Sequence, residues 1–255
     1  MPPLQRRLRL FAVPMLVILT PSVIIYGDAM SDQVLPEWDL LLSSAARLQH
    51  ILPSAVLVGG TAASLHAKHR FSRDADHVLT NLRDRFDEIL ADLEQVAGWK
   101  TARIRRPVMI LGSLDGIETG IRQLIREQPL ETMQVDCNGQ IVTVPTLAEI
   151  LRIKAVLILK RNATRDYLDF VALADRMDPS EIVAALARFD DYYPQPNGES
   201  ALQQLQVQLA KPLPYDLEST KLDEYKNLAP KWHDWSLVEN VAAEIAVLIL
   251  NHLDA

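Results

Sequence analysis

The chain has 255 residues, of which 49% are hydrophobic and 23% charged, with a formal net charge of −7 and a pI of about 5.4. This is the composition of a soluble globular protein with room for one large or two small domains, and it argues against a protein that coats nucleic acid with a generally basic surface. The single cysteine, Cys137, excludes an internal disulfide framework and fits a reducing cytosol.

The N-terminus combines a basic flank with an apolar run. Three arginines precede an uncharged stretch over residues 10–27, which contains two prolines and is short for a membrane span of about 20 residues. We interpret residues 1–30 as an apolar extension outside the fold. Three explanations stay open: an over-extended start with translation from Met30, a signal or anchor segment, or a docked N-terminal element.

Residues 31–145 are predicted to form an α/β core. Apolar residues recur at helical spacing over 39–50 and 84–96, and a short helix is expected over 61–69. The predicted strands cover residues 55–58, 75–79, 108–114, 117–125, 130–137 and 141–144. The last four form two hairpins, because Asp-Gly and Asn-Gly dipeptides at 115–116 and 138–139 favour two-residue turns.

Residues 146–255 are predicted to form a helical domain. Thr146 and Glu149 have the spacing of a capping box at the start of a helix that ends near residue 160. Asp178-Pro179 begins a later helix. Other helices are expected over about 164–175, 199–210 and 235–253. The predicted fold class is therefore α+β, with a small mixed sheet flanked by helices and followed by a helical C-terminal half.

The most informative motif is AVLVGGTAASLHAKHRFSRDADHVL, over residues 55–79. A tight turn at Gly59-Gly60 lets backbone N–H groups approach a triphosphate. Asp74 and Asp76 are two residues apart on a predicted strand, so both carboxylates point to one face and together can hold divalent cations. This ordered set matches the requirements of nucleotidyl transfer.

Further polar residues are candidates for phosphate contacts. Arg70 and Ser72 precede the aspartate pair, where they can contact phosphate or form an ordinary salt-bridged helix exit. Lys154 lies in an otherwise apolar helix, where a buried ammonium is costly unless it meets an anion. Arg165 and Asp169 have the i,i+4 spacing of a helical ion pair.

Two segments, GGTAASLHAKHRFSRDAD and TLAEILRIKAVLILKRNATRDYLD, resemble the AbiEii/AbiGii-type nucleotidyltransferases. These are the toxin components of type IV toxin–antitoxin systems and belong to the DNA polymerase β-like superfamily. The resemblance spans about residues 50–177. It implies Mg²⁺ or Mn²⁺ as cofactor, an NTP (ATP, GTP, CTP or UTP) as co-substrate, a cognate antitoxin as partner, and tRNA in some members as acceptor.

With this resemblance, the expected nucleotide-binding residues are Gly59, Gly60, Thr61, Arg70, Ser72 and Lys154. The expected catalytic residues are Asp74, Asp76, Lys154 and Asp166. Asp74 and Asp76 are the implied metal ligands. The superfamily usually adds a third carboxylate from a neighbouring strand, and Glu118 and Asp136 are both candidates for it.

The resulting hypothesis is a cytoplasmic, metal-dependent nucleotidyltransferase that moves an NMP from an NTP to an acceptor hydroxyl, on tRNA or another macromolecule, as a toxin. Two alternatives stay open, a small-molecule (antibiotic-type) nucleotidyltransferase and an inactive nucleotide-binding module. Arg103, Arg105 and Arg106 form a basic patch that either guides RNA or is a solvated strand end. No membrane partner is expected unless residues 1–29 are native.

Overall fold

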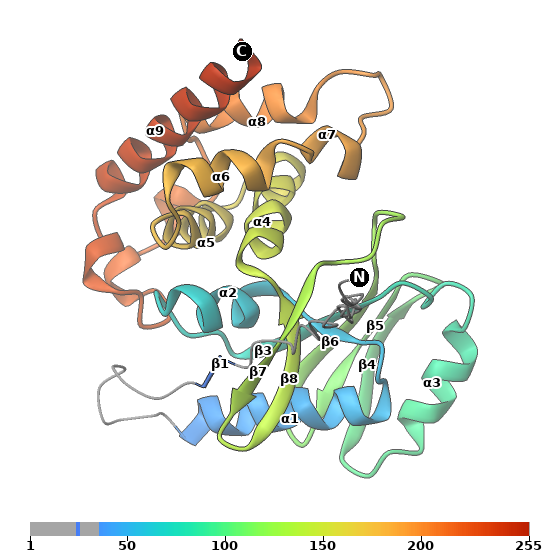
Figure 1. Ribbon diagram of the computed structural model, residues 1–255. Helices are drawn as coiled ribbons and strands as arrows, with labels where there is room; N and C mark the ends of the chain where they lie inside the picture. Colours follow the sequence, from blue (N-terminus) through green and yellow to red (C-terminus); the bar gives the residue numbers. More distant parts are fainter. Residues whose placement is uncertain (1–23, 26–35, 255) are drawn as a thin grey trace, which may run out of the picture.

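The computed structural model describes residues 24–25 and 36–254 (Figure 1). The basic flank and most of the apolar N-terminal run lie outside the described residues. Ile24 and Ile25, which the sequence pattern placed in an extension outside the fold, instead form a strand that pairs with residues 135–136. The predicted α+β fold class is confirmed, with a mixed sheet, helices around it and a helical C-terminal part.

A five-stranded sheet with the order β2-β3-β6-β5-β4 forms the centre of the first half. Its strands are β2 (Val56–Leu57), β3 (Asp74–Leu79), β4 (Trp99–Arg105), β5 (Met109–Leu114) and β6 (Ile117–Gln123). β3 and β6 run parallel, and the other neighbours run antiparallel. The parallel pair lies in the middle of the sheet.

Helices α1 (Pro36–Ile51) and α3 (Phe86–Glu94) cover one face of this sheet. Leu48 of α1 and Ile89 of α3 are buried against Ile110 and Ile121 of the sheet. Along β3 the burial alternates, so that Ala75, His77 and Leu79 are buried while the residues between them stay half-buried. The opposite face of the sheet therefore presents polar side chains toward the helical half.

The second predicted hairpin does not join this sheet. β7 (Thr132–Cys137) and β8 (Gln140–Pro145) pair with β1 (Ile24–Ile25) in a separate three-stranded sheet of order β1-β7-β8. Its apolar side chains, including Val135 and Val142, pack with Leu41 and Ala45 of α1. Both two-residue turns have the positive φ values expected of their Asp-Gly and Asn-Gly dipeptides.

The edge strand β4 was not predicted, because its sequence WKTARIR lacks an apolar alternation. Only Trp99 is buried, and residues 100–105 are exposed at the edge of the sheet. Charged side chains on an edge strand hinder pairing with another chain. Pairing with β5 therefore determines this strand, and the local pattern does not indicate it.

The helical half begins at α4 and packs above the sheet (Figure 1). Its α-helices are α4 (Leu147–Arg161), α5 (Thr164–Ala174), α6 (Pro179–Leu186), α7 (Phe189–Tyr192), α8 (Ala201–Ala210) and α9 (Trp235–Leu253). Short 3₁₀ helices cover Leu217–Ser219, Leu222–Glu224 and Pro230–Trp232. Within the described part of the chain, α9 alone is long and apolar enough to cross a membrane, and its buried side chains pack in the core of the helical half.

Two helix starts show how local sequence sets the elements. Thr146 caps α4 by accepting a hydrogen bond from the backbone N–H of Glu149. The Glu149 carboxylate does not complete the predicted capping box, because it is buried between Arg126 and Arg152. In contrast, Asp178 and Glu181 form a complete capping box at α6.

Candidate active site

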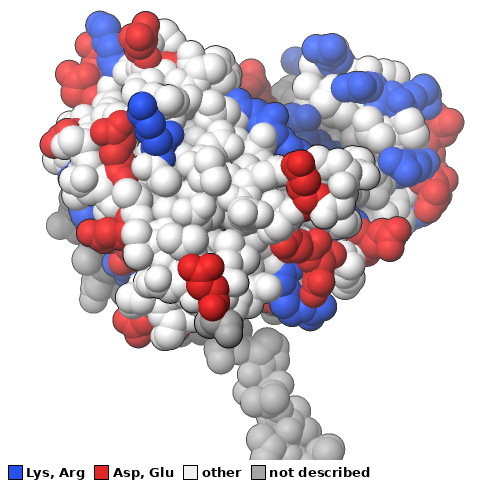
Figure 2. Space-filling model, turned by 90° about the horizontal axis from the view of Figure 1, so that it is seen from above, with Lys and Arg blue, Asp and Glu red and all other residues white. Residues whose placement is uncertain are grey.

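A cleft of about 740 Å³ separates the polar face of the five-stranded sheet from helices α4 and α5. The glycine turn at Gly59-Gly60, which begins helix α2 (Gly59–Ala67), lies on its wall with the β3 carboxylates and basic side chains of α4. Figure 2 shows Lys and Arg side chains gathered in the hollow between the two parts of the molecule. The cleft therefore collects most of the residues that the sequence singled out.

The carboxylates come from the parallel strand pair. Asp74 and Asp76 are half-buried on the cleft face of β3, and Glu118 of β6 lies opposite Asp74 in the strand register. Asp136 belongs to the separate sheet, where its carboxylate accepts a 2.7 Å hydrogen bond from the Gly139 N–H in the hairpin turn. Of the two candidates for a third carboxylate, only Glu118 lines the cleft.

Glycines allow the close approach of backbone to these groups. A Cβ atom on Gly60 would lie 2.6 Å from Nη2 of Arg70, and a Cβ on Gly120 would lie 2.3 Å from Oδ1 of Asp76. Gly59 has φ of +74°, which side-chain-bearing residues rarely adopt. Gly120 lies opposite Asp76 in the β3–β6 register, and sequence reasoning missed it because the register was not known.

Asp169 of α5 is the centre of a buried ion cluster behind the cleft. Its Oδ1 accepts hydrogen bonds of 2.7 Å from Nε2 of His69 and 2.7 Å from Nε of Arg70. Its Oδ2 accepts 2.9 Å from Nη2 of Arg70 and lies 2.7 Å from Nζ of Lys154. The side chains of all four residues are at most 3% exposed.

The cluster carries a net positive charge. Burial would raise the pKa of Asp169, but the charges of Arg70 and Lys154 and the His69 hydrogen bond hold it well below its usual value. Burial lowers the pKa of His69, so its imidazole is neutral near pH 7. The cluster therefore contains two cations and one carboxylate, which leaves an excess of one positive charge. Because Arg70 and Lys154 also line the cleft, this excess charge favours an anion there.

The structure shows what three of the predicted residues in this region contact. Asp166 is fully buried outside the cleft lining, and it holds Arg161 through two contacts of 2.5 and 2.6 Å. Thr61 is also fully buried, and its hydroxyl donates a 2.7 Å hydrogen bond to the Asp74 carbonyl. The predicted pair of Arg165 with Asp169 is wrong, because Asp169 points into the buried cluster.

Several cleft residues were missed because they come from distant parts of the chain. Arg161, Lys100, Arg122 and Lys226 line the cleft together with the predicted Arg165. In all, seven cationic side chains line it against three carboxylates. The excess stays positive when Asp166 and Asp169, which pair with these cations from behind, are included.

Ser72 and Lys226 stabilise the charged form of Asp74. The Ser72 hydroxyl donates a 2.7 Å hydrogen bond to Oδ1 of Asp74. Burial would raise the pKa of Asp74, but this hydrogen bond and the Lys226 charge outweigh it and lower the pKa below its usual value. The carboxylate is therefore ionised at neutral pH.

The donor set of the cleft fits a hard divalent cation. Asp74 and Asp76 present carboxylate oxygens on one face, and neither is closed off by protein on all sides. Among the described residues, no three His, Cys, Asp or Glu side chains form a ready-made metal cage. Mg²⁺ does not require one, because it is typically held by one or two carboxylates together with waters and substrate phosphates.

Comparisons with known proteins agree with this geometry. Residues 40–236 match the model of the family described as nucleotidyl transferase AbiEii toxin of a type IV toxin–antitoxin system. Among solved structures, an H. pylori protein that is named as a nucleotidyltransferase superposes on this chain with a TM-score of 0.52 at 16% sequence identity. That superposition covers 88% of this chain and 98% of that chain, and it supports the fold.

Curated relatives match over a smaller share of their own length. The chain is 30% identical over 213 residues to the protein named heme uptake protein MmpL11 of Mycobacterium tuberculosis, which covers 77% of this chain and 22% of that protein. It is 27% identical over 238 residues to the mycolic acid-containing lipids exporter MmpL11 of Mycolicibacterium smegmatis, covering 92% of this chain and 23% of that protein. The chain thus spans less than a quarter of these relatives.

Proposed function

The chain belongs to the AbiEii nucleotidyltransferase family, and we propose that it transfers an NMP from an NTP to a hydroxyl of an RNA acceptor, with a divalent cation, as the toxin of a toxin–antitoxin pair. One observation carries the proposal: two β3 carboxylates, a glycine turn and two cations of the buried cluster, Arg70 and Lys154, line one cleft. The toxin role and a cognate antitoxin follow from the family. A cytoplasmic location follows from the need for NTP.

The triphosphate would lie between the glycine turn and a cationic wall formed by Arg70, Lys154 and Arg161. Arg70 and Lys154 are already fixed by Asp169, and Arg161 is fixed by Asp166, so they lose little freedom when they bind phosphate oxygens. Fixed cations stabilise the charge that builds on the phosphates during transfer. Asp166 and Asp169 are then positioning residues that hold the phosphate ligands.

The carboxylates would serve the reacting end of the nucleotide. Asp74 and Asp76 would hold the metal, which supplies positive charge at the α-phosphate and lowers the pKa of the acceptor hydroxyl. Glu118, which is exposed and lies opposite Asp74 in the strand register, would take the hydroxyl proton. The acceptor oxygen then bonds to the α-phosphorus, the bond to the β-phosphate oxygen breaks, and pyrophosphate leaves.

A basic row beside the cleft favours a polyanionic acceptor. In register, Lys100 pairs with Ser113 and Arg103 with Leu111, both of which line the cleft from β5. Arg105 pairs with Met109, which itself lies opposite the cleft residue Arg122. A cationic aminoglycoside would instead favour an acidic lining. The small-molecule alternative therefore has less support from the charges.

The test incubates wild-type protein with Mg²⁺ or Mn²⁺, each α-³²P-labelled NTP and total RNA, beside an Asp74→Ala/Asp76→Ala variant. We expect label in a tRNA-sized band with wild type only. Label on a small molecule would favour the alternative acceptor class. Absence of label, together with NTP binding that does not depend on the metal, would leave an inactive nucleotide-binding module.

A further inference from the structure

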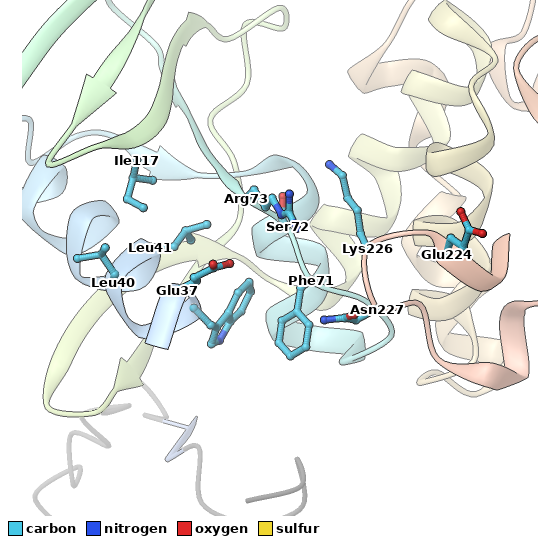
Figure 3. Close-up of a pocket in the computed structure, with 11 residues that line it drawn as sticks. Glu37, Leu40, Leu41, Phe71, Ser72, Arg73, Ile117, Glu224, Lys226 and Asn227 are labelled. Atoms are coloured by element: carbon cyan, nitrogen blue, oxygen red, sulfur yellow. The ribbon is translucent and has the colours of Figure 1, made fainter. Parts of the chain in front are cut away.

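A second pocket, of about 390 Å³, adjoins the active-site cleft between α1, residues 71–73 and residues 224–227 (Figure 3). Ser72 and Lys226 line both the pocket and the cleft, so the two spaces share a wall. The Ser72 hydroxyl is 2.7 Å from Oδ1 of Asp74. A molecule in the pocket would thus lie beside one of the catalytic carboxylates.

The floor of the pocket is apolar and aromatic. Trp38 and Phe71 meet edge-to-face with ring centroids 5.5 Å apart and an interplanar angle of 64°. Leu40, Leu41 and Ile117 complete the apolar surface. A planar ring can pack against aromatic side chains such as these, as bases do in single-stranded nucleic acid sites.

The polar residues of the pocket are balanced in charge. Glu37 and Glu224 are matched by Arg73 and Lys226, and the Asn227 amide adds a neutral donor and acceptor. The neighbouring cleft, by contrast, has an excess of cations. This division favours phosphate in the cleft and an uncharged group with a planar ring and a polar edge in the pocket.

Residues 226–229, which include two residues that line the pocket, are hydrogen-bonded to the core. The Phe71 N–H donates a 2.9 Å hydrogen bond to the Lys226 carbonyl, and the Ala229 N–H donates 2.7 Å to the His69 carbonyl. Lys226 and Asn227 both have positive φ, of 47° and 51°. Consecutive side-chain-bearing residues in this conformation persist where the surrounding structure holds them.

We propose that this pocket binds the nucleoside that carries the attacking hydroxyl of the acceptor. The base packs against Trp38 and Phe71, the polar edge meets Asn227, and the ribose hydroxyl reaches Asp74 past Ser72. A two-substrate transfer requires two adjoining sites, and the cleft has a volume typical of a complete ligand site on its own. This inference rests on the proposed function.

The kinetic test uses full-length Trp38→Leu and Phe71→Leu proteins with labelled NTP and an RNA acceptor. Each variant should raise the KM for RNA roughly 5- to 150-fold, the range that corresponds to loss of one base–aromatic contact, and leave the KM for NTP unchanged. Trp38→Phe should restore most of the loss. Tyr215→Ala, which removes an exposed aromatic outside the pocket, is the matched control.

A second measurement does not depend on turnover. RNA with a 3′-terminal 4-thiouridine is irradiated with wild-type protein, and the cross-linked peptides are identified by mass spectrometry. Cross-links at residues 37–41, 71–73 or 224–227 support the subsite. The subsite would be overturned by cross-links that lie only elsewhere, by a rise in the KM for NTP, or by unchanged kinetics in folded variants. If the wild-type protein transfers no label to RNA, the proposed function itself would be overturned.

Discussion

Asp169 determines the position of the cationic wall, although it does not touch the cleft itself. Its carboxylate binds Arg70 on both oxygens and also binds Lys154 and His69. Buried ion pairs gain little net stability, because desolvation offsets the attraction between the charges. The role of Asp169 is therefore best understood as holding Arg70 and Lys154 in place, so that these two cations can bind an anion in the cleft.

Removing this carboxylate should destabilise the protein strongly. Asp169→Asn leaves Arg70 and Lys154 buried without their counter-charge, and breaking a buried pair in this way typically costs about 3–5 kcal/mol. Urea denaturation followed by circular dichroism measures the change. Asp175→Asn, which removes an exposed pair with Lys231 at the end of α5, should cost less than about 1 kcal/mol. Equal losses in both variants would contradict this account.

We expect the substitution Gly120→Ala to reduce activity while the protein still folds. In Gly120→Ala the new Cβ would collide with Oδ1 of Asp76, so that carboxylate must move. A displacement of about 1 Å at a reacting group can cost around 100-fold in rate, and we expect a drop of that order in nucleotidyl transfer together with weaker Mn²⁺ binding. Transfer assays and metal titration by electron paramagnetic resonance measure the two effects.

The matched control is Gly139→Ala in the β7–β8 turn, where a Cβ meets open space. Its positive φ should cost stability of about 1 kcal/mol but leave the transfer rate unchanged. If both glycine variants lose activity to the same degree, the Asp76 contact is not the cause.

At the scale of elements, local pattern predicted what local physics determines. The alternation in β3, the two hairpin dipeptides and the proline start of α6 all appear in the structure near the expected residues. The sequence pattern did not predict strand β4, because an exposed edge strand needs no apolar face. The second sheet did not follow either, since the pairing of β7 with β1 is not encoded in the hairpin itself.

The candidate site shows the same division. Asp74 and Asp76 were recognisable because i and i+2 on a strand share a face. Asp166 and Asp169, one turn apart on α5, could not be distinguished by spacing, and only packing shows that each holds a different cation. The choice of Glu118 over Asp136 depends on which strand lies beside β3, and this too is a property of the assembled sheet.

A bulge in β4 leads to a prediction about acceptor binding. The register with β5 shifts between Thr101 and Arg103, which brings Arg103 and Arg105 onto the face of Lys100. If these arginines contact RNA phosphates, Arg103→Ala/Arg105→Ala should weaken RNA binding. It should also reduce the slope of log affinity against log salt by roughly 1.4, or about 0.7 for each lost contact.

Fluorescence anisotropy with labelled RNA at several KCl concentrations provides the slope. Arg83→Ala/Arg188→Ala removes two arginines that are exposed and lie outside the cleft lining, so the net charge changes equally. An equal change of slope in this control would mean that the effect comes from total charge, and the β4 row would lose its special role.

At the scale of the whole molecule, the Asp169 cluster joins the two halves of the chain. His69 and Arg70 come from the core, whereas Lys154 and Asp169 come from helices of the C-terminal half. The backbone hydrogen bonds of residues 69–71 with 226–229 reinforce the same junction. The cleft therefore depends on a contact that forms only when both halves are folded, and we expect them to unfold together.

This burial also makes the stability of the whole protein depend on pH. Burial is the main cause that lowers the pKa of His66 and His69 below 6.5, and it lowers the pKa of His77 to about 4. Unfolded histidines bind protons at a higher pH than these folded ones do. The stabilisation is therefore complete above pH 6.5 and is lost as the pH falls through and below 6.5 toward the folded values.

The free energy of unfolding should consequently fall between pH 7 and pH 5, with each neutral buried imidazole contributing up to about 1.4 kcal/mol per pH unit. Urea titrations at half-unit intervals give the curve. His66→Gln keeps a hydrogen-bond donor for the Pro145 carbonyl but removes the titration, so its slope should be shallower by that amount or less. A wild-type curve that is flat over this range would mean that the buried histidines exchange protons through local opening, and the junction between the two halves would then be looser than its contacts indicate.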